Sequence, residues 1–474
     1  MKKHWPIIIF LSIFFVLIAS KLISHPTPFF DWDESLYVQT GKEMIEQNRF
    51  LMPVWQGAYW LDKPPLVPLI YGLIIKLTFF STPEVTTRLF SLFISIIILS
   101  FVYVFYNRVL KNRWLATLMV VITALTPLFL QRAQTVNLDI FILLGWLGYL
   151  LFFNNFFVSL FFLFIAVMGK SLIGFYPVAL IFIYYLYKFF KKEIKQKELE
   201  KVIKKILIQS FILSLWFVAM FLIFGKAFFW QHIIESHFRR VTSSIEFHFG
   251  QRTFYITLAL EQMGYFFYFA IIGGIVIFIN FLKNKVSSEA FLTIFYLLPW
   301  FIFLNLTKTK IFWYLYPAIP QFAILAVVWI KQFNKKSLQI FFGMLLLLVL
   351  FYQSFSKQNV LAINYSKPEP YYDLSLYAKN QCQSLELLIN KTSRESFATL
   401  DKLGLLITTT KWWGDHPSMV YYFGKKINFY YDTESFNKNF KNKGCFVIDK
   451  NDASYLNNLI GKSKQYGDYY LIMK

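Results

Sequence analysis

Three carboxylates, Asp31, Asp33 and Glu34, lie within four residues of one another directly after the first apolar segment of the chain. A carboxylate held at the boundary between lipid and water can take a proton from an acceptor that lies within hydrogen-bond reach. The same residues could do less, because an Asp can cap a following helix and a Glu in the first turn complements the helix dipole. The pattern therefore leaves open a general base and a capped helix with a solvated loop.

Basic side chains recur on the face of the membrane where positive charge is expected to be scarce. Several cations on that face run against the bias that orients membrane proteins, and together they suit a lipid phosphate or diphosphate. A single cation at a helix end is more often an anchor in the interface, and aromatic side chains there commonly form a belt. The basic candidates are Lys63, Arg88, Arg132, Lys170, Arg239, Arg240, Arg252, Lys308 and Lys310, with Trp55, Tyr59, Trp60, Trp313, Tyr314 and Tyr316 beside them. Asp139 lies in the same outer loop as Arg132.

A carboxylate base beside phosphate-binding cations is suited to moving a sugar from a lipid phosphate to an acceptor hydroxyl or phosphate. The base would take the acceptor's proton, and the cations would stabilise the charge that develops on the departing phosphate. The sequence contains no nucleotide-binding glycine-rich motif. Asp31, Asp33 and His237 or His248 form no recognisable ligand pattern, so no obligatory metal is expected, although a divalent ion remains an option.

The composition is that of a polytopic membrane protein. Of the 474 residues, 57% are hydrophobic and only 16% are charged, and apolar runs are long enough to cross a bilayer. The formal charge of +22 comes largely from Lys and Arg in short loops. The positive-inside rule explains that distribution and removes the argument for a nucleic-acid partner. Membrane lipids are the expected surroundings.

The distribution of charge predicts the topology. The basic loops 107–113, 188–205, 283–285 and 331–336 are expected in the cytoplasm. Segment 66–80 carries Lys76 and is marginal for crossing, so it is expected to lie along the interface or to re-enter. About eleven spans follow: 5–23 (a retained span rather than a cleaved signal peptide), 88–106, 114–130, 140–153, 156–168, 172–187, 206–224, 263–281, 290–304, 312–330 and 338–355.

The chain is expected to divide into a transmembrane domain, 1–355, and a soluble α/β domain outside the cytoplasm, 356–474. In the first outer loop, 34–47 is predicted to be an amphipathic helix on the membrane surface. In the tail, 403–410 and 444–450 are predicted to be buried strands and 376–390 a helix. Cys382 and Cys445 both lie in this tail and could pair if it is extracytoplasmic.

Several short motifs together resemble the GT-C-type membrane glycosyltransferases of the protein O-mannosyltransferase and aminoarabinose lipid A transferase superfamily. The resemblance is carried, in order, by DESLY (33–37), DKPPL (62–66), RL (88–89), RAQTVNLD (132–139), GK (169–170) and KTKIFWYLYPAIP (308–320). It implies a polyprenyl-phosphate sugar donor, transfer with inversion, and an active site on the extracytoplasmic face of a bacterial-type plasma membrane.

The resemblance also implies roles for individual residues. Asp33 would be the acceptor-side base with Glu34 in support, and Lys63 would contact the donor phosphate. The remaining substrate-binding candidates are Asp139, Arg88, Tyr37, Tyr59, Lys170, Lys308 and Lys310. The stretch Lys308–Pro317 has Ile-Phe-Trp where the family has a more Leu-Pro-like core, and the tail does not match it. These departures leave the acceptor open among an envelope lipid, a glycan and a protein.

Two other functions fit parts of the sequence. DWD (31–33) and WWGD (412–415) faintly resemble motifs of oligosaccharyltransferases, although the order after the tryptophans differs. A transporter or lipid flippase would instead place ionisable residues deep in the spans, and Glu261 and Lys76 are the best candidates for that. The sugar, the lipid carrier and the acceptor are not specified by the sequence.

Overall fold

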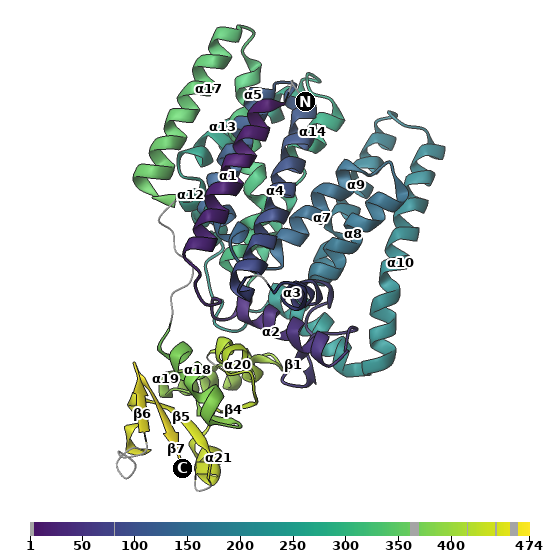
Figure 1. Ribbon diagram of the computed structural model, residues 1–474. Coiled ribbons are helices and arrows are strands. Elements are labelled where there is room, and N and C mark those ends of the chain that lie inside the picture. The colour runs from purple at the N-terminus through teal and green to yellow at the C-terminus, as the bar shows by residue number, and fades with distance from the viewer. Residues whose placement is uncertain (1–3, 80, 361–368, 415, 441–442, 456–462) are drawn as a thin grey trace.

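The computed structural model describes residues 4–79, 81–360, 369–414, 416–440, 443–455 and 463–474. It has a large helical bundle and, at one end, a small domain that contains a sheet (Figure 1). The fold class predicted from the sequence, an all-α polytopic membrane protein with a small α/β domain at its carboxyl end, is confirmed.

The bundle is built from helices of very different length. Long apolar helices alternate with short ones that either break a span or lie beside the bundle's end. The elements are α1 (Trp5–Ser24), α2 (Asp33–Glu46), α3 (Leu66–Leu77), α4 (Pro83–Leu110), α5 (Arg113–Leu125), α6 (Pro127–Ala133), α7 (Asp139–Leu151), α8 (Phe156–Lys170), η1 (Ser171–Phe175), α9 (Tyr176–Phe190), α10 (Gln196–Phe228), η2 (Phe229–Arg239), α11 (Arg240–Thr242), α12 (Phe254–Met263), α13 (Tyr265–Leu282), α14 (Ser288–Phe295), α15 (Leu298–Leu306), η3 (Phe312–Ala318), α16 (Ile319–Val328), η4 (Trp329–Gln332), α17 (Lys336–Phe351) and η5 (Tyr352–Lys357).

Among the described residues, seven helical segments are long and apolar enough to cross a membrane, or up to nine if each of two bent pairs counts as one span. The expected eleven differs because α7 is too short to qualify and 156–190 counts as one segment. The chain nevertheless turns back within that segment, since Gly174 packs against the backbone of Val167. The number eleven stays a prediction.

Helices α2 and α3 form a layer at the end of the bundle that faces the small domain (Figure 1). They cross closely at two glycines: a Cβ on Gly41 would lie 2.0 Å from the carbonyl oxygen of Pro68, and one on Gly72 would lie 2.2 Å from that of Gly41. With 12 residues, α3 is about 18 Å long and cannot span a bilayer, which agrees with its expected position at the interface.

The prediction that 34–47 lies on the membrane surface as an amphipathic helix is only partly right. The helix forms, but residues 34–41 are buried on every side. Helix α3 covers one side, and α20 (Pro417–Phe423) of the small domain contacts another. The first outer loop is therefore enclosed between the bundle and the small domain.

The small domain is built on a five-stranded sheet with the strand order β4-β3-β5-β7-β6. Strand β3 (Leu385–Leu388) pairs in parallel with β4 (Ile427–Tyr430) and β5 (Cys445–Asp449), whereas β7 (Tyr469–Met473) runs antiparallel to β5 and to β6 (Ser463–Tyr466). Helices α18 (Pro370–Gln381), α19 (Lys391–Lys402) and α21 (Thr433–Phe440), with the short η7 (Thr410–Trp412) and η8 (Lys450–Tyr455), complete it.

The local predictions for this domain have mixed outcomes. The strand predicted at 444–450 is confirmed as β5. The helix predicted over 376–390 is wrong beyond Gln381, because the apolar run that follows becomes the central strand β3. The strand predicted at 403–410 is wrong: this segment is irregular, and its threonine hydroxyls bond to carboxylates of the bundle instead of to a neighbouring strand.

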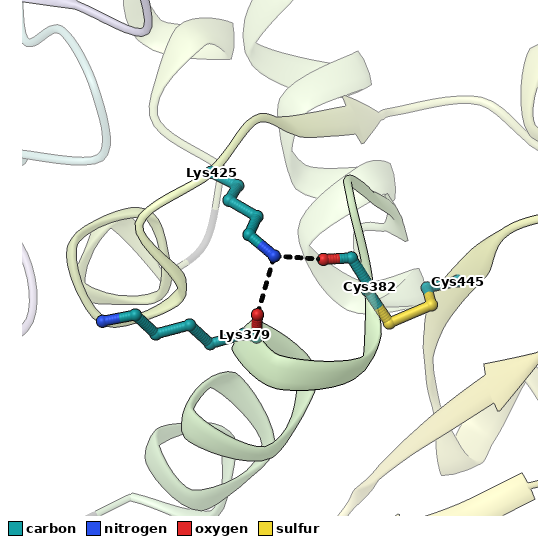
Figure 2. Close-up of a disulfide and its surroundings, with 4 residues drawn as sticks. All are labelled: Lys379, Cys382, Lys425 and Cys445. Atoms are coloured by element: carbon teal, nitrogen blue, oxygen red, sulfur yellow. Dashed lines mark hydrogen bonds between the residues drawn. A yellow bond between two sulfur atoms is a disulfide. The ribbon is translucent and has the colours of Figure 1, made fainter.

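A disulfide joins Cys382, just after α18, to Cys445 at the start of β5, with the two Cα atoms 6.0 Å apart (Figure 2). Next to it, the Lys425 ammonium donates to the carbonyl oxygens of Lys379 and Cys382, at 2.7 Å each. These bonds satisfy carbonyl groups that the end of a helix leaves without intrahelical partners. The pairing that the sequence left open is therefore present in the structure.

Candidate active site

Asp33 is the first residue of α2, at the end of the bundle that the small domain covers. The preceding residue, Trp32, has a φ of 74°, a strained conformation for a bulky side chain. No side chain caps the amino end of α2 in the part of the chain that the structure describes, so neither aspartate acts as the expected cap. The Asp33 side chain stays 21% exposed, and an Arg132 nitrogen lies 3.7 Å from its carboxylate.

Asp33 is surrounded by charges that come from distant parts of the chain. Burial raises the pKa of Asp33 above its ordinary value, the Arg132 guanidinium opposes that rise, and Asp139 adds to it. Lys170 and Lys63 also act on Asp33 and lower its pKa. The structure thus brings together the predicted residues Asp33, Lys63, Asp139 and Lys170; we call these four with Arg132 the Asp33 cluster.

Two members of this cluster form a tight ion pair. The Lys170 ammonium, at the last residue of α8, lies 2.7 Å from an Asp139 oxygen at the first residue of α7. Aromatic rings cover the cations, with Lys170 4.2 Å from the ring centre of Tyr314 and Arg132 4.8 Å from that of Trp313. Both aromatic residues belong to the FWYLY stretch, which explains how this part of the sequence contributes.

Lys63 is the cation that remains available. It has no hydrogen-bonded partner among the residues that the structure describes, although Asp62 precedes it. Burial, reinforced by Arg240, lowers the pKa of Lys63 to about 8, while Asp62 acts in the opposite direction. A half-buried ammonium with no bonded counter-ion is well suited to receive a phosphate oxygen.

Glu34 is held differently from its neighbour Asp33. Its two oxygens accept hydrogen bonds from the Arg88 guanidinium at 3.0 and 2.6 Å and from the backbone N–H groups of Phe30 and Val136 at 2.7 and 2.8 Å. Arg88 also donates to the carbonyl oxygens of Thr27 and Pro28. This network joins α2, α4 and the loop after α6. Arg88 was expected at the phosphate, but its donors are already engaged here.

Asp31 binds the small domain. Its carboxylate accepts from the Tyr371 hydroxyl at 2.8 Å and the Ser418 backbone N–H at 2.9 Å, and it lies 3.0 Å from the His416 Nδ1. Its histidine neighbour is therefore His416, and not the His237 or His248 considered from the sequence. The three carboxylates of the opening motif have separate surroundings: Asp31 at the small domain, Asp33 in the cluster and Glu34 in the Arg88 network.

Three threonines of the small domain reach carboxylates of the bundle. Thr409 donates to Asp62 at 2.9 Å, while the Thr408 and Thr410 hydroxyls each lie 3.1 Å from the carboxylate oxygens of Glu235 and Glu246, respectively. The Trp413 ring packs edge-on against Trp60 at 5.0 Å, and Trp60 stacks on Tyr37. The predicted residue Tyr37 thereby lies beside Asp33, whose charge acts on it. The sequence did not predict these contacts between the small domain and the bundle. The TTT run (408–410) was the signal that could have indicated them.

Besides Glu34, Arg88 and Tyr37, three more predicted residues lie outside the Asp33 cluster. Tyr59 packs against Phe224 and Arg49 in the hairpin of β1 (Val54–Trp55) and β2 (Ala58–Tyr59). The Lys310 ammonium donates to the carbonyl oxygens of Leu304 and Asn305 at the end of α15. Lys308 is exposed. Trp412 and Trp413 of the WWGD segment are described, whereas its Asp415 lies outside the described residues.

The described residues include no group of three or more His, Cys, Asp or Glu side chains arranged to hold a metal ion. Asp33 and Asp139, the carboxylates of the cluster, each have a cation as their near neighbour. This donor set does not fit a divalent cation, because the added positive charge would be repelled by Arg132 and Lys170.

Comparison with known proteins supports the fold. No family model matches the chain. A protein of Aquifex aeolicus (strain VF5), described as uncharacterized, is 24% identical over 317 residues, which are 65% of this chain and 60% of that protein. The chain thus matches less than two thirds of the length of this relative.

Two solved membrane proteins have similar structures. The crystal structure of ArnT from Cupriavidus metallidurans bound to undecaprenyl phosphate superimposes with a TM-score of 0.69 at 12% identity, over 98% of this chain and 97% of that one. The oligosaccharyltransferase of Archaeoglobus fulgidus, in complex with zinc and sulfate, gives a TM-score of 0.58 at 14% identity, over 93% of this chain and 67% of that one. The chain therefore has the same overall fold as these two proteins.

Proposed function

We propose that this protein is an integral membrane glycosyltransferase that moves one sugar from a polyprenyl-phosphate donor to an acceptor outside the cytoplasm, with inversion at the anomeric carbon. The observation that carries the proposal is the Asp33 cluster: a partly exposed carboxylate with a raised pKa lies among three cations, one of which has no bonded partner among the described residues. The GT-C fold, and the undecaprenyl phosphate bound to a neighbour of that fold, support this donor class.

In the proposed reaction Asp33 accepts the proton of the acceptor hydroxyl as the oxygen attacks the anomeric carbon. The bond between that carbon and the phosphate oxygen breaks, and its electron pair leaves with the lipid phosphate. A base whose pKa is raised is better matched to this transfer than an ordinary aspartate. Lys63 would bind the phosphate directly, and Lys170 and Arg132 would add to the field that stabilises the departing charge.

Glu34 and Arg88 are proposed as positioning residues. Their mutual bonds fix the start of α2 against α4 and against the loop that carries Arg132 and Asp139. Without that network the carboxylate of Asp33 would no longer be held in a fixed position relative to the cations. Tyr37, next to Asp33 and stacked on Trp60, is proposed to contact the sugar or the acceptor.

The extracytoplasmic location of this end is part of the proposal. The basic loops gather at the opposite end of the bundle, where Arg108, Lys188 and Lys285 line one cavity, and such loops are typically cytoplasmic. The disulfide of the small domain fits an oxidising compartment, which is the side that the Asp33 cluster would then face. A bacterial-type plasma membrane satisfies both conditions.

Mass spectrometry of membrane lipids and envelope polymers tests the proposal. Cells that express Asp33→Asn should accumulate a polyprenyl-phosphate sugar and an acceptor that is one sugar short, whereas cells with the native protein should not. Glu46→Gln is the matched control, since Glu46 is an exposed carboxylate at the other end of the same helix. Identical lipid and polymer profiles for the native protein and Asp33→Asn would refute the proposed activity.

A further inference from the structure

A large cavity lies at the end of the bundle opposite the Asp33 cluster. It has a volume of about 760 Å³ and is bounded by the carboxyl ends of α4 and α7, by α9, and by the connection between α13 and α14. Helix α7 carries Asp139 at one end and lines this cavity with Leu150 and Leu151 at the other. Twelve residues of helix separate the two, or about 18 Å, so this cavity is distinct from the candidate active site.

The cavity is strongly positive. Five basic side chains line it against the single carboxylate of Glu289, and the other polar lining groups are neutral amides and hydroxyls. The basic residues are Arg108, Lys111, Lys188, Lys285 and Lys331. One of them, Lys331, donates to the carbonyl oxygen of Val109 across the cavity wall, while the remaining charges are not balanced by carboxylates of the lining. A phosphate-bearing ligand would compensate this excess.

An apolar groove adjoins the positive cavity. It has a volume of about 300 Å³ and shares two lining residues with the cavity, Tyr184 and Leu292. The rest of its wall is almost wholly aliphatic or aromatic, with Leu180, Ile183, Phe281 and Phe295 as examples. A ligand with a negative head and a hydrocarbon tail would fill both spaces at once, whereas a free phosphate would use only the first.

We propose that these adjoining spaces form a binding site for an anionic phospholipid at the end of the bundle opposite the Asp33 cluster. The phosphate head would lie in the positive cavity and one acyl chain in the groove. Zwitterionic lipids fit less well, because their own ammonium group would meet the five cations. The site is independent of the proposed transfer reaction and would be expected even if that reaction were wrong.

The position of the site agrees with the leaflet in which anionic lipids act. It is formed next to the basic loops 107–113, 188–205 and 331–336, which face the cytoplasm under the positive-inside rule. Basic pockets between transmembrane helices on that side are suited to lipid phosphates. Positive loops alone would attract such lipids diffusely, so the distinguishing feature is the pairing of charge with the apolar groove.

The test measures lipid binding to the purified full-length protein by native mass spectrometry and by thermal melting in mixed micelles. The ligands are phosphatidylglycerol, phosphatidylcholine and inorganic phosphate. We compare Lys188→Gln/Lys285→Gln with Lys191→Gln/Lys192→Gln, which removes the same charge from exposed positions that do not line the cavity. A third variant, Ile183→Trp, narrows the groove and leaves every cation in place.

The proposal predicts that phosphatidylglycerol binds the native protein at least tenfold more tightly than phosphatidylcholine. Lys188→Gln/Lys285→Gln should weaken that binding about tenfold or more, and Lys191→Gln/Lys192→Gln should not. Ile183→Trp should also weaken it, because the acyl chain loses its space. Equal effects of the two lysine pairs would overturn the site. Stabilisation by inorganic phosphate equal to that by phosphatidylglycerol would show a phosphate pocket and no lipid site.

Discussion

The two ends of the helical bundle use positive charge in opposite ways. At the end that the small domain covers, Arg88, Arg132 and Lys170 each have a carboxylate from a distant segment beside them. At the other end, five cations line a cavity that contains one carboxylate. Paired charges fix geometry, because breaking a buried pair is costly, whereas unpaired charges attract an external anion. Within the Asp33 cluster Lys63 is the exception, since it has no bonded carboxylate among the described residues, and it is there that we place the donor phosphate.

The most direct test of this contrast removes the base and keeps the two closer pairs, Arg88–Glu34 and Lys170–Asp139. Asp33→Asn should lower turnover by about 10²–10⁴-fold, the usual contribution of a general base, because the amide cannot accept the acceptor's proton. Thermal melting should change little, since Asp33 is partly exposed and its nearest cation lies 3.7 Å away. Turnover measured with extracted lipid-linked sugars, beside melting curves, checks both expectations. Comparable turnover in Asp33→Asn and Glu46→Gln would rule out Asp33 as the base.

Replacement of Glu34, the residue next to Asp33, should affect the stability of the fold more than the chemical step. Glu34→Gln leaves the Arg88 guanidinium buried without its counter-ion, which should destabilise the fold by about 3–5 kcal/mol. The measurement is the melting temperature of the purified protein, with Asp33→Asn and Glu46→Gln as comparisons. If Glu34→Gln melted like the native protein while losing activity, Glu34 would have to be moved from a positioning role to the chemistry itself.

Substitution of Lys63 tests whether the cation without a bonded carboxylate is the one that binds the donor phosphate. The Lys63 pKa is lowered to about 8, so the ammonium loses its proton as the pH rises through that value, and the attraction for a phosphate is lost with it. The KM for the lipid-linked donor should therefore rise above pH 8. Lys63→Gln should raise the KM about 10–100-fold at neutral pH, as expected for a lost bond to a charged group. Lys63→Arg should retain binding and should remove the rise in KM above pH 8, because the guanidinium stays charged. A KM for Lys63→Arg as high as that for Lys63→Gln at neutral pH would contradict the assignment.

The smallest expected effect comes from the cation that tunes the base. Arg132 lowers the pKa of Asp33, so Arg132→Gln should raise it further. Because only the ionised carboxylate can accept a proton, the acidic limb of the profile of kcat/KM against pH should move to higher pH. Lys308→Gln removes an exposed cation outside the cluster and should leave that limb in place. A shift to lower pH in Arg132→Gln would show that another group controls the limb.

Much of the fold was predictable because membrane insertion requires long apolar runs and basic loops, which are visible in the local sequence. Apolar length and basic loops were enough to place most helices, including α3, which is too short to cross a bilayer. Predictions from local sequence patterns were wrong where a segment's structure depends on pairing with a segment far along the chain. The stretch 385–388 becomes a strand only because β4 and β5, far along the chain, pair with it.

The candidate site was predictable to the level of residue type and order. Asp33, Lys63, Asp139 and Lys170 were all singled out from the sequence, and the structure brings them together. The sequence did not separate Asp31, Asp33 and Glu34, because their different surroundings depend on Ser418, Arg132 and Arg88. The threonines 408–410 were likewise out of reach, since Thr409 meets Asp62 across 347 positions of the chain.

Binding of undecaprenyl phosphate to the purified protein tests the central claim most directly. The account predicts that Lys63→Gln/Lys170→Gln binds this lipid at least tenfold more weakly than the native protein. Lys308→Gln, an exposed cation outside the cluster, should bind it like the native protein. Equal affinities of all three proteins, each shown to be folded by its melting curve, would contradict the assignment of the Asp33 cluster as the site of the lipid phosphate.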